Sequence, residues 1–305
     1  MYHNIKSCVQ SVNPQDQNDP NSSHFSEYFT SNIGVRQGEN LSPILFSLFL
    51  NDLEEYLINK NNNGINLSEY THDTDLLPLL KILVLLYADD TVLLANDHLS
   101  LQKSLNDFME FCTQWKLEVN IEKTKVVIFG ARNTNGYNFF INGSNIEIVD
   151  SYKYLGIFFS KTSNFNKAKK HLIDQADKAL HFLYTRINNI QLPIDLTLKL
   201  FDHTIVPILT YSCEVWGFSN LDLIEQIHHK FLRNVIKVKK TTPSYMIMAE
   251  LGRYPLEIII NCKMIGFWLR LVTGNQNKLS FKIYQLMLNI PNFQSKWITH
   301  VQTIL

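Results

Sequence analysis

The sequence predicts an α+β fold in which an antiparallel sheet with packed helices is followed by an all-helical region. Up to about residue 160, short apolar runs typical of strands alternate with helical segments, and beyond it apolar residues recur at helical spacing over long stretches. Charge divides at nearly the same place, because residues 1–150 hold 9 basic and 19 acidic side chains whereas residues 151–305 hold 19 and 9. These observations predict two domains, 1–160 and 161–305.

Composition excludes several classes of protein. With 45% hydrophobic and 18% charged residues, the 305-residue chain has too much apolar surface for a disordered protein. Its four cysteines stand far apart, which favours a reduced, intracellular protein of the cytoplasm or nucleus. The N-terminal stretch does not resemble a signal peptide, and the richest apolar run, residues 76–86, contains Pro78 and Lys81 and is too short to span a membrane.

Each element of the first region follows from local pattern. Ser42 and Pro43 predict an N-cap and a first helical residue, opening a helix over residues 44–57. Apolar runs at 82–86 and 91–95 flank YADD at 87–90 and predict a hairpin. Apolar spacing of +4 and +3 predicts a helix over about 101–115, and residues 125–129 and 154–159 are predicted to be single strands.

The second region is predicted to contain long helices at about 166–187, 193–206, 221–236 and 256–272. Basic residues on the first of these helices and in a later cluster could follow a phosphate backbone, although an ordinary solvated surface is the alternative. These residues are Lys167, Lys169, Lys170, Lys178, Arg186, Lys237, Lys239 and Lys240. Three aromatic residues, Tyr211, Trp216 and Trp268, are expected in the core rather than as stacking platforms.

Two adjacent carboxylates in an apolar setting are the strongest chemical signal in the sequence. Asp89 and Asp90 interrupt LVLLYADDTVLLA, where two neighbouring anions require a compensating positive charge. Hard oxygen ligands at the tip of a hairpin suit Mg²⁺. The alternative is that both are ordinary turn residues, because Asp is common in turns.

Neighbouring segments add groups that could bind a nucleotide. Arg36 and Gln37 stand between Gly34 and Gly38, where backbone can approach a ligand closely beside a cation and an amide. Downstream, NIEKT places Lys123 between a predicted helix and strand, and YKYLG follows at 152–156.

In this order, the segments resemble the palm of a reverse transcriptase, and they are most similar to the LINE-like enzymes of non-LTR retrotransposons. YADD resembles the metal-binding hairpin of that family, and RQG (36–38) resembles the segment that lines the template and the incoming nucleotide. NIEKT resembles the segment whose lysine lies near the nucleotide phosphates, and YKYLG resembles the primer grip. YSCEVWG (211–217) and residues 250–271 are similar to the helical region that follows in such elements.

The resemblance implies a partial polymerase palm followed by a helical thumb and a C-terminal helical region. Asp89 and Asp90 would hold two Mg²⁺ (or Mn²⁺) ions, about 3.5 to 4 Å apart, which activate the primer 3′-hydroxyl and stabilise the leaving pyrophosphate. Lys123 would neutralise phosphate charge or donate a proton, unless it is simply a solvated lysine at a strand edge.

The remaining site residues are also assigned by resemblance. Arg36, Gln37 and Gly38 would position the template and nucleotide, and Tyr87 would lie beside the nucleotide, a half-buried strand aromatic being the alternative. Tyr154, Leu155 and Gly156 would form the primer grip. The implied partners are an RNA template, a DNA primer and deoxynucleoside triphosphates, with no membrane, and the oligomeric state stays open.

One departure from the family pattern concerns a further metal-binding Asp on a strand before RQG. Only 33 residues precede Gly34, and the aspartates among them, Asp16 and Asp19, lie in NPQDQNDP without a flanking apolar strand. Asp73 and Asp75 follow the RQG segment and are poor substitutes. We therefore expect the fingers and first palm strand to be missing, and expect this chain alone not to extend a primer.

Three functions remain open at this point. The first is a reverse transcriptase domain whose ancestral reaction is RNA-templated DNA synthesis. The second is a catalytically dead remnant that binds RNA or a hybrid duplex, and the third is a mobile-element fragment without function.

Overall fold

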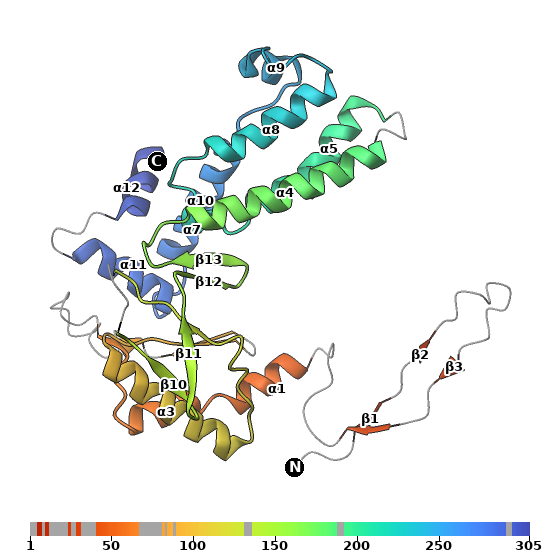
Figure 1. Ribbon diagram of the computed structural model, residues 1–305. Helices are drawn as coiled ribbons and strands as arrows, with labels where there is room; N and C mark the ends of the chain where they lie inside the picture. Colours follow the sequence, from red (N-terminus) through yellow and green to blue (C-terminus); the bar gives the residue numbers. More distant parts are fainter. Residues whose placement is uncertain are drawn as a thin grey trace.

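The computed structural model confirms the α+β class (Figure 1). It describes residues 5–7, 10–11, 24–25, 29–31, 41–66, 81–82, 84–87, 90–130, 136–187, 192–290 and 295–305, with backbone alone for the strands before residue 41 and at a few later positions. Four short strands come first, β1 (Ile5–Ser7), β2 (Gln10–Ser11), β3 (His24–Phe25) and β4 (Phe29–Ser31). β1 pairs with β4 and β2 with β3, both antiparallel, and together they form the ladder that extends to one side in Figure 1.

The predicted helix over residues 44–57 is two helices, α1 (Ser42–Phe49) and α2 (Leu53–Asn59). The break contains the exposed Asn51 and Asp52, which are weak helix formers because their side chains compete for backbone hydrogen bonds. The prediction of Ser42 as N-cap was wrong, since the helix already includes Ser42 and Leu41 is the capping residue.

The hairpin predicted around YADD is confirmed. β7 (Val84–Tyr87) pairs antiparallel with β8 (Asp90–Leu93), in a register that sets Tyr87 opposite Asp90. A smaller pair, β5 (Ile65–Asn66) and β6 (Lys81–Ile82), precedes it. The predicted helix that follows is α3 (His98–Trp115), which starts where the Asp97 carboxylate accepts the Ser100 N–H at 2.9 Å.

Two hairpins with similar turns follow α3. β10 (Phe139–Ile141) pairs antiparallel with β11 (Ser144–Ile148), and β11 pairs parallel with β9 (Lys125–Val126), the short form of the predicted strand over 125–129. The β10–β11 hairpin was not predicted, although Asn142-Gly143 is the dipeptide that favours a type I′ turn. Both turn residues have positive φ, 49° and 77°.

The second hairpin corrects a prediction. Residues 154–159 are not one strand, because β12 (Ser151–Tyr154) turns back into β13 (Ile157–Ser160). Leu155 and Gly156 form the two-residue turn, with φ of 47° and 84°. Leucine is an unusual residue at such a position, so the local sequence does not indicate a turn here.

The rest of the chain is helical. The four long helices predicted here are confirmed within a few residues as α4 (Asn166–Ile187), α5 (Ile194–Thr204), α8 (Asp222–Val235) and α10 (Leu256–Thr273). Shorter helices that were not predicted are α6 (Val206–Leu209), α7 (Cys213–Trp216), α9 (Ser244–Glu250), α11 (Leu279–Asn289) and α12 (Lys296–Ile304). None of the described helices is long and apolar enough to cross a bilayer.

The largest apolar core lies among these helices, with Trp216, Phe201 and Phe231 fully buried in it. Phe201 and Phe231 stack with ring centroids 4.0 Å apart. Ile157 of β13 joins the same core, so packing continues across the predicted domain boundary at residue 160. In Figure 1 the β12–β13 hairpin accordingly lies directly against α4, between the smaller sheets and the helices. The division into domains 1–160 and 161–305 stays a prediction.

Lys169 was wrongly placed on the basic surface of α4. Its side chain is only 6% exposed, and its ammonium donates to Ser219 Oγ at 3.0 Å and to the Asn220 carbonyl at 2.8 Å. It therefore joins α4 to the loop before α8 and is not available for a phosphate backbone.

Candidate nucleic-acid interface

The β7–β8 hairpin exposes polar groups at its tip, while its base packs against a hydrophobic core. Val84 and Leu93, paired at the base, pack partly buried against the core formed by α1, α2 and α3. At the other end Tyr87 is 62% exposed and Asp90, opposite it, is also exposed. Asp89 lies outside the described residues. The hairpin thus holds the Asp90 carboxylate at the surface on a rigid support.

The β12–β13 hairpin carries the predicted primer grip, and groups at the β7–β8 tip act on it electrostatically. Tyr154, the last residue of β12, is half-buried. Burial raises the pKa of Tyr154, and the negative charges of Asp90 and of ionised Tyr87 raise that pKa further. Both residues of the first hairpin therefore act electrostatically on Tyr154.

Lys123 is fixed beside the same hairpin by its backbone. Asn120 Oδ1 accepts the Lys123 N–H at 3.0 Å, and the Thr124 hydroxyl donates to the Asn120 carbonyl at 2.8 Å, so NIEKT forms a tight turn. The hydroxyl of Tyr152 in β12 donates to the Lys123 carbonyl at 3.2 Å, which joins the two segments. The Lys123 side chain itself is exposed.

The structure therefore assembles three of the four predicted motifs. Tyr87 and Asp90 act electrostatically on Tyr154, and the Lys123 turn is bonded to the strand that carries Tyr154. Arg36, Gln37 and Gly38 of the RQG segment lie outside the described residues, as Asp89 does. Their roles stay predictions.

Sequence reasoning missed one residue at this site, Tyr211, which was expected in the core. Its side chain is 46% exposed, and its hydroxyl donates to the Leu155 carbonyl in the β12–β13 turn at 3.0 Å. The contact spans more than fifty positions of sequence, so no local pattern signals it. The resemblance of YSCEVWG to the family's helical region was the available hint.

The chemistry of Asp90 suits a hard divalent cation, because an exposed carboxylate at the end of an anchored strand offers oxygen ligands without rearrangement. Within the described ranges, which exclude Asp89, no three His, Cys, Asp or Glu side chains gather closely enough to hold a metal ion.

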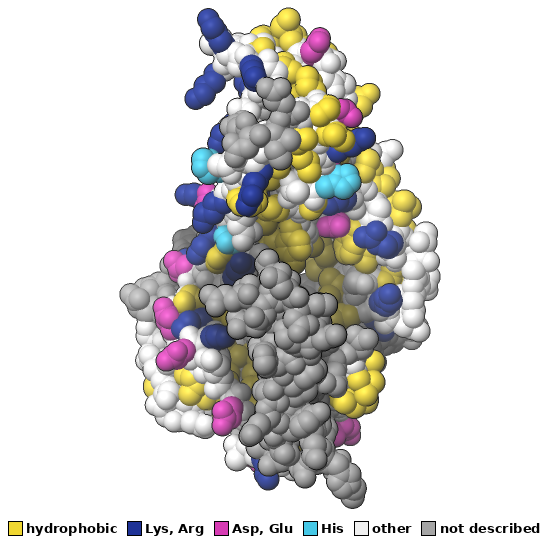
Figure 2. Space-filling view, turned by 90° about the vertical axis from the view of Figure 1, so that its right-hand side faces the viewer, with side chains coloured by type: hydrophobic (Ala, Val, Ile, Leu, Met, Phe, Trp, Pro, Cys, Tyr) yellow, Lys and Arg dark blue, Asp and Glu magenta, His cyan; other side chains and the backbone are white. Residues whose placement is uncertain are grey.

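Cations line the junction of β12 with α4. Lys153 Nζ lies 3.0 Å from His171 Nε2, and the Lys167 ammonium sits over the Phe158 ring, 4.9 Å from its centroid. Burial, with the charges of Lys153 and Lys178, lowers the pKa of His171 despite the opposing effect of Asp174. Figure 2 shows Lys and Arg side chains along one edge of the helical part.

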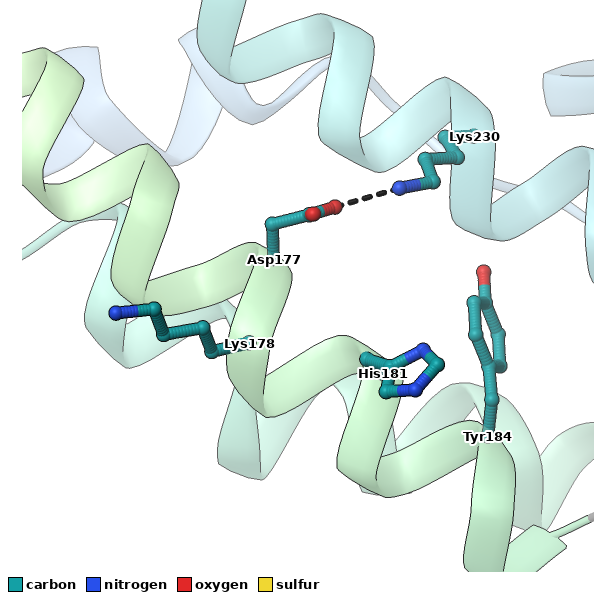
Figure 3. Close-up of a pocket in the computed structure, with 5 residues that line it drawn as sticks. All are labelled: Asp177, Lys178, His181, Tyr184 and Lys230. Carbon is teal, nitrogen blue, oxygen red and sulfur yellow. Dashed lines mark hydrogen bonds and ion pairs between the residues drawn. The ribbon is translucent and has the colours of Figure 1, made fainter.

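A shallow pocket of about 390 Å³ lies further along this helical surface, between α4 and α8 (Figure 3). Asp177 and Lys230 form an ion pair across it at 2.5 Å, and His181 and Tyr184 line its other side. Burial, with the nearby Asp177 charge, raises the pKa of Tyr184 to about 12. Lys178, one of the basic residues predicted to follow a phosphate backbone, lines this pocket, but none of the predicted catalytic, nucleotide-binding or primer-grip residues does.

Comparison with known proteins identifies the family. Residues 4–159 match the family model described as reverse transcriptase (RNA-dependent DNA polymerase). This range includes the YADD, NIEKT and YKYLG segments described above. No solved structure matches the chain.

Several curated relatives come from mobile elements. The chain is 27% identical to the RNA-directed DNA polymerase from mobile element jockey of Drosophila funebris, over 66% of this chain and 22% of that protein. It is 26% identical to the probable RNA-directed DNA polymerase from transposon BS of Drosophila melanogaster, over 66% of this chain and 22% of that protein. A Pol polyprotein from the type-1 retrotransposable element R2 of Popillia japonica is 30% identical over 42% of this chain and 21% of that protein.

The chain spans less than a quarter of the length of these relatives. The family match covers half of the chain, and the relatives confirm the resemblance to enzymes of non-LTR retrotransposons. This protein belongs to the reverse transcriptase (RNA-dependent DNA polymerase) family.

Proposed function

We propose that this chain forms the part of an RNA-directed DNA polymerase that receives the end of a DNA primer paired to an RNA template. The supporting observations are that Asp90 and Tyr87 of one hairpin act electrostatically on Tyr154 of another, distant in sequence, and that the Tyr152 hydroxyl bonds this second hairpin to the Lys123 turn. A surface that combines an exposed carboxylate, aromatic side chains and nearby lysines suits a nucleic-acid end together with a bound cation.

Asp89 and Asp90 are proposed to hold Mg²⁺ or Mn²⁺. Such an ion, when bound, offsets the negative charge that develops on phosphate oxygens during nucleotidyl transfer. The protein's own contribution is the fixed position of Asp90, set by the β7–β8 ladder and by the burial of its base.

The other residues are proposed to position the reactants. The turn formed by Leu155 and Gly156, with Tyr154 before it, would hold the primer strand. Lys123, exposed beside β12, would neutralise phosphate charge or donate a proton to the leaving group.

The incoming nucleotide and the template would meet a separate set of side chains. Tyr87 would lie beside the nucleotide, and Arg36, Gln37 and Gly38 would position the nucleotide and the template.

The thiols of Cys112, Cys213 and Cys262 are free, which supports the proposed intracellular location.

An RNA-templated primer-extension assay with Mg²⁺ tests the proposed reaction. DNA product that is lost in the Asp90→Asn variant and retained in the Asp52→Asn variant would support it, and would overturn the expectation that this chain alone does not extend a primer. Asp52 is a matched control because it is exposed in the same half of the chain and its side chain makes no capping hydrogen bond at α2. Product that persists in Asp90→Asn would contradict the role of this carboxylate.

A second candidate function is duplex binding without synthesis, favoured by the cations at the junction of β12 with α4. Lys153, Lys167 and His171 lie there close together, next to the proposed primer grip. This function predicts binding of an RNA–DNA hybrid that weakens steeply with salt while no product forms. If the protein binds the hybrid no better than it binds free nucleotides, both candidates fail.

A further inference from the structure

The YSCEVWG segment, residues 211–217, has no role in the function proposed so far, yet it is tightly held. The buried Trp216 indole donates from Nε1 to the Tyr211 carbonyl at 2.9 Å, closing the segment on itself. Ser212 adopts the left-handed region with φ of 52°, a conformation that such side chains rarely take without support from their surroundings.

Gly217, the last residue of the segment, packs closely against α10. A Cβ atom at Gly217 would lie 2.5 Å from Ile260 Cγ2 and 2.9 Å from Met264 Sδ. Ile260 and Met264 are both fully buried. Tyr211 therefore projects from a rigid platform in the core of the helical region.

The Tyr211 ring covers the turn of the β12–β13 hairpin. Its hydroxyl donates to the Leu155 carbonyl at 3.0 Å. A Cβ atom at Gly156 would lie 2.9 Å from Tyr211 Cε1 and 3.3 Å from the hydroxyl oxygen, so the ring occupies the space that a side chain would need. Gly156 also has a φ of 84°, which favours glycine independently.

This contact explains how leucine is held in a strained turn. Leu155 has a φ of 47°, whereas the equivalent position in the β10–β11 turn is Asn142, a residue that tolerates such backbone. Strain of this kind persists where the surroundings impose it, and it is often found at functional sites. Here the hydrogen bond from Tyr211 is made to the strained residue itself.

We propose that Tyr211 is a positioning residue, which fixes the Leu155–Gly156 turn so that Tyr154 and the turn hold the primer end in line with the β7–β8 hairpin. The proposal rests on the primer-binding function proposed above. Its geometric basis is the joint presence of the hydroxyl contact, the ring over Gly156 and the rigid platform beneath Tyr211.

The test compares Tyr211→Phe with Tyr245→Phe in the full chain. Phenylalanine at 211 keeps the ring over Gly156 and removes only the hydrogen bond, while Tyr245 is 73% exposed and serves as the matched control. The probe is a DNA primer that carries 2-aminopurine at its 3′ end, annealed to an RNA template. Fluorescence anisotropy of the probe at saturating protein reports how firmly the bound primer end is held.

We expect Tyr211→Phe to bind the hybrid about fivefold more weakly, as loss of one neutral hydrogen bond implies. At saturation its primer-end anisotropy should be lower than that of the unaltered chain, with no change for Tyr245→Phe. A general loss of stability would alter the bound fraction but not the signal at saturation.

Two results would contradict the inference in distinguishable ways. If Tyr211→Phe and the unaltered chain give the same anisotropy at saturation and the same affinity, the positioning role is overturned while primer binding stands. If the unaltered chain binds the hybrid and leaves the primer-end signal unchanged, the primer-binding function fails, and the role of Tyr211 fails with it.

Discussion

Replacement of Gly156 by alanine should destabilise the β12–β13 hairpin by two separable effects. The first is backbone strain, because an alanine side chain disfavours a φ of 84°, which glycine adopts readily, at a cost of about 1 kcal/mol. The second is overpacking, because the new Cβ would lie 2.9 Å from the Tyr211 ring, and such contacts cost about 1 to 3 kcal/mol. Together they predict a loss of about 2 to 4 kcal/mol.

Gly143 provides the matched control. It occupies the same position of the β10–β11 turn with a φ of 77°, and a Cβ atom there would meet nothing within 4 Å. Gly143→Ala should therefore cost only the backbone term, about 1 kcal/mol. The difference between the two variants measures the contact with Tyr211.

Amide hydrogen exchange resolves the two hairpins separately, which global unfolding of a 305-residue chain does not. Exchange in β10–β11 should be about fivefold faster in Gly143→Ala, and exchange in β12–β13 about thirtyfold faster or more in Gly156→Ala. Combining Gly156→Ala with Tyr211→Ala should bring the cost of the glycine substitution down to the backbone term, since the obstructing ring is then absent. Equal losses in the two single variants, or an unchanged cost in the double variant, would refute the contact.

Three further predictions concern groups in the helical region and α3. Burial of the Glu225 carboxyl opposes its ionisation, but hydrogen bonds from His228 and from the Glu257 N–H leave its pKa below the usual 4.5. The stabilisation that ionised Glu225 contributes is therefore present above pH 4.5 and is lost as the pH falls through the depressed pKa. Unfolding measured against pH should accordingly be less acid-sensitive in Glu225→Gln, and equal sensitivity would count against this assignment. Burial lowers the pKa of Lys169 from 10.5, because a charged ammonium is less favourable inside the fold. As the pH increases from the depressed pKa toward 10.5, the folded protein loses this charge before the unfolded chain does, so its stability rises. Lys169→Met should lack that rise in alkaline unfolding curves. Burial raises the pKa of Cys112 to about 11 and that of Cys213 to about 12, while Cys262 is exposed. Iodoacetamide at about pH 8 should therefore modify Cys262 before Cys112 and Cys213 in the folded protein, and mass spectrometry showing equal rates for these three would contradict the packing.

Sequence pattern predicted the elements whose signal is local. The apolar runs around YADD specified the β7–β8 hairpin, and regular apolar spacing specified α3, α4 and α8, because a buried face imposes its own period on the sequence. The family assignment came from ordered motifs rather than from periodicity, and the family match confirmed it.

The errors came from features that local pattern does not encode. The Leu155–Gly156 turn has no local signal, since leucine is atypical at a positive φ, and the residue that holds it, Tyr211, lies far away in sequence. Lys169 was predicted to be solvated because lysine usually is, yet Ser219 and Asn220 satisfy its ammonium inside the fold. In both cases a distant contact overrides the residue's ordinary preference.

The β7–β8 and β12–β13 hairpins are proposed to receive the primer end together. Photo-crosslinking from a 4-thiothymidine at the 3′ end of a DNA primer, annealed to RNA and bound by the full chain, reports which segments touch that end. We expect crosslinks to peptides from both hairpins, around Tyr87 and around Tyr154, competed by unlabelled hybrid. Crosslinks confined to α4, α8 or other helices, with neither hairpin modified, would contradict it.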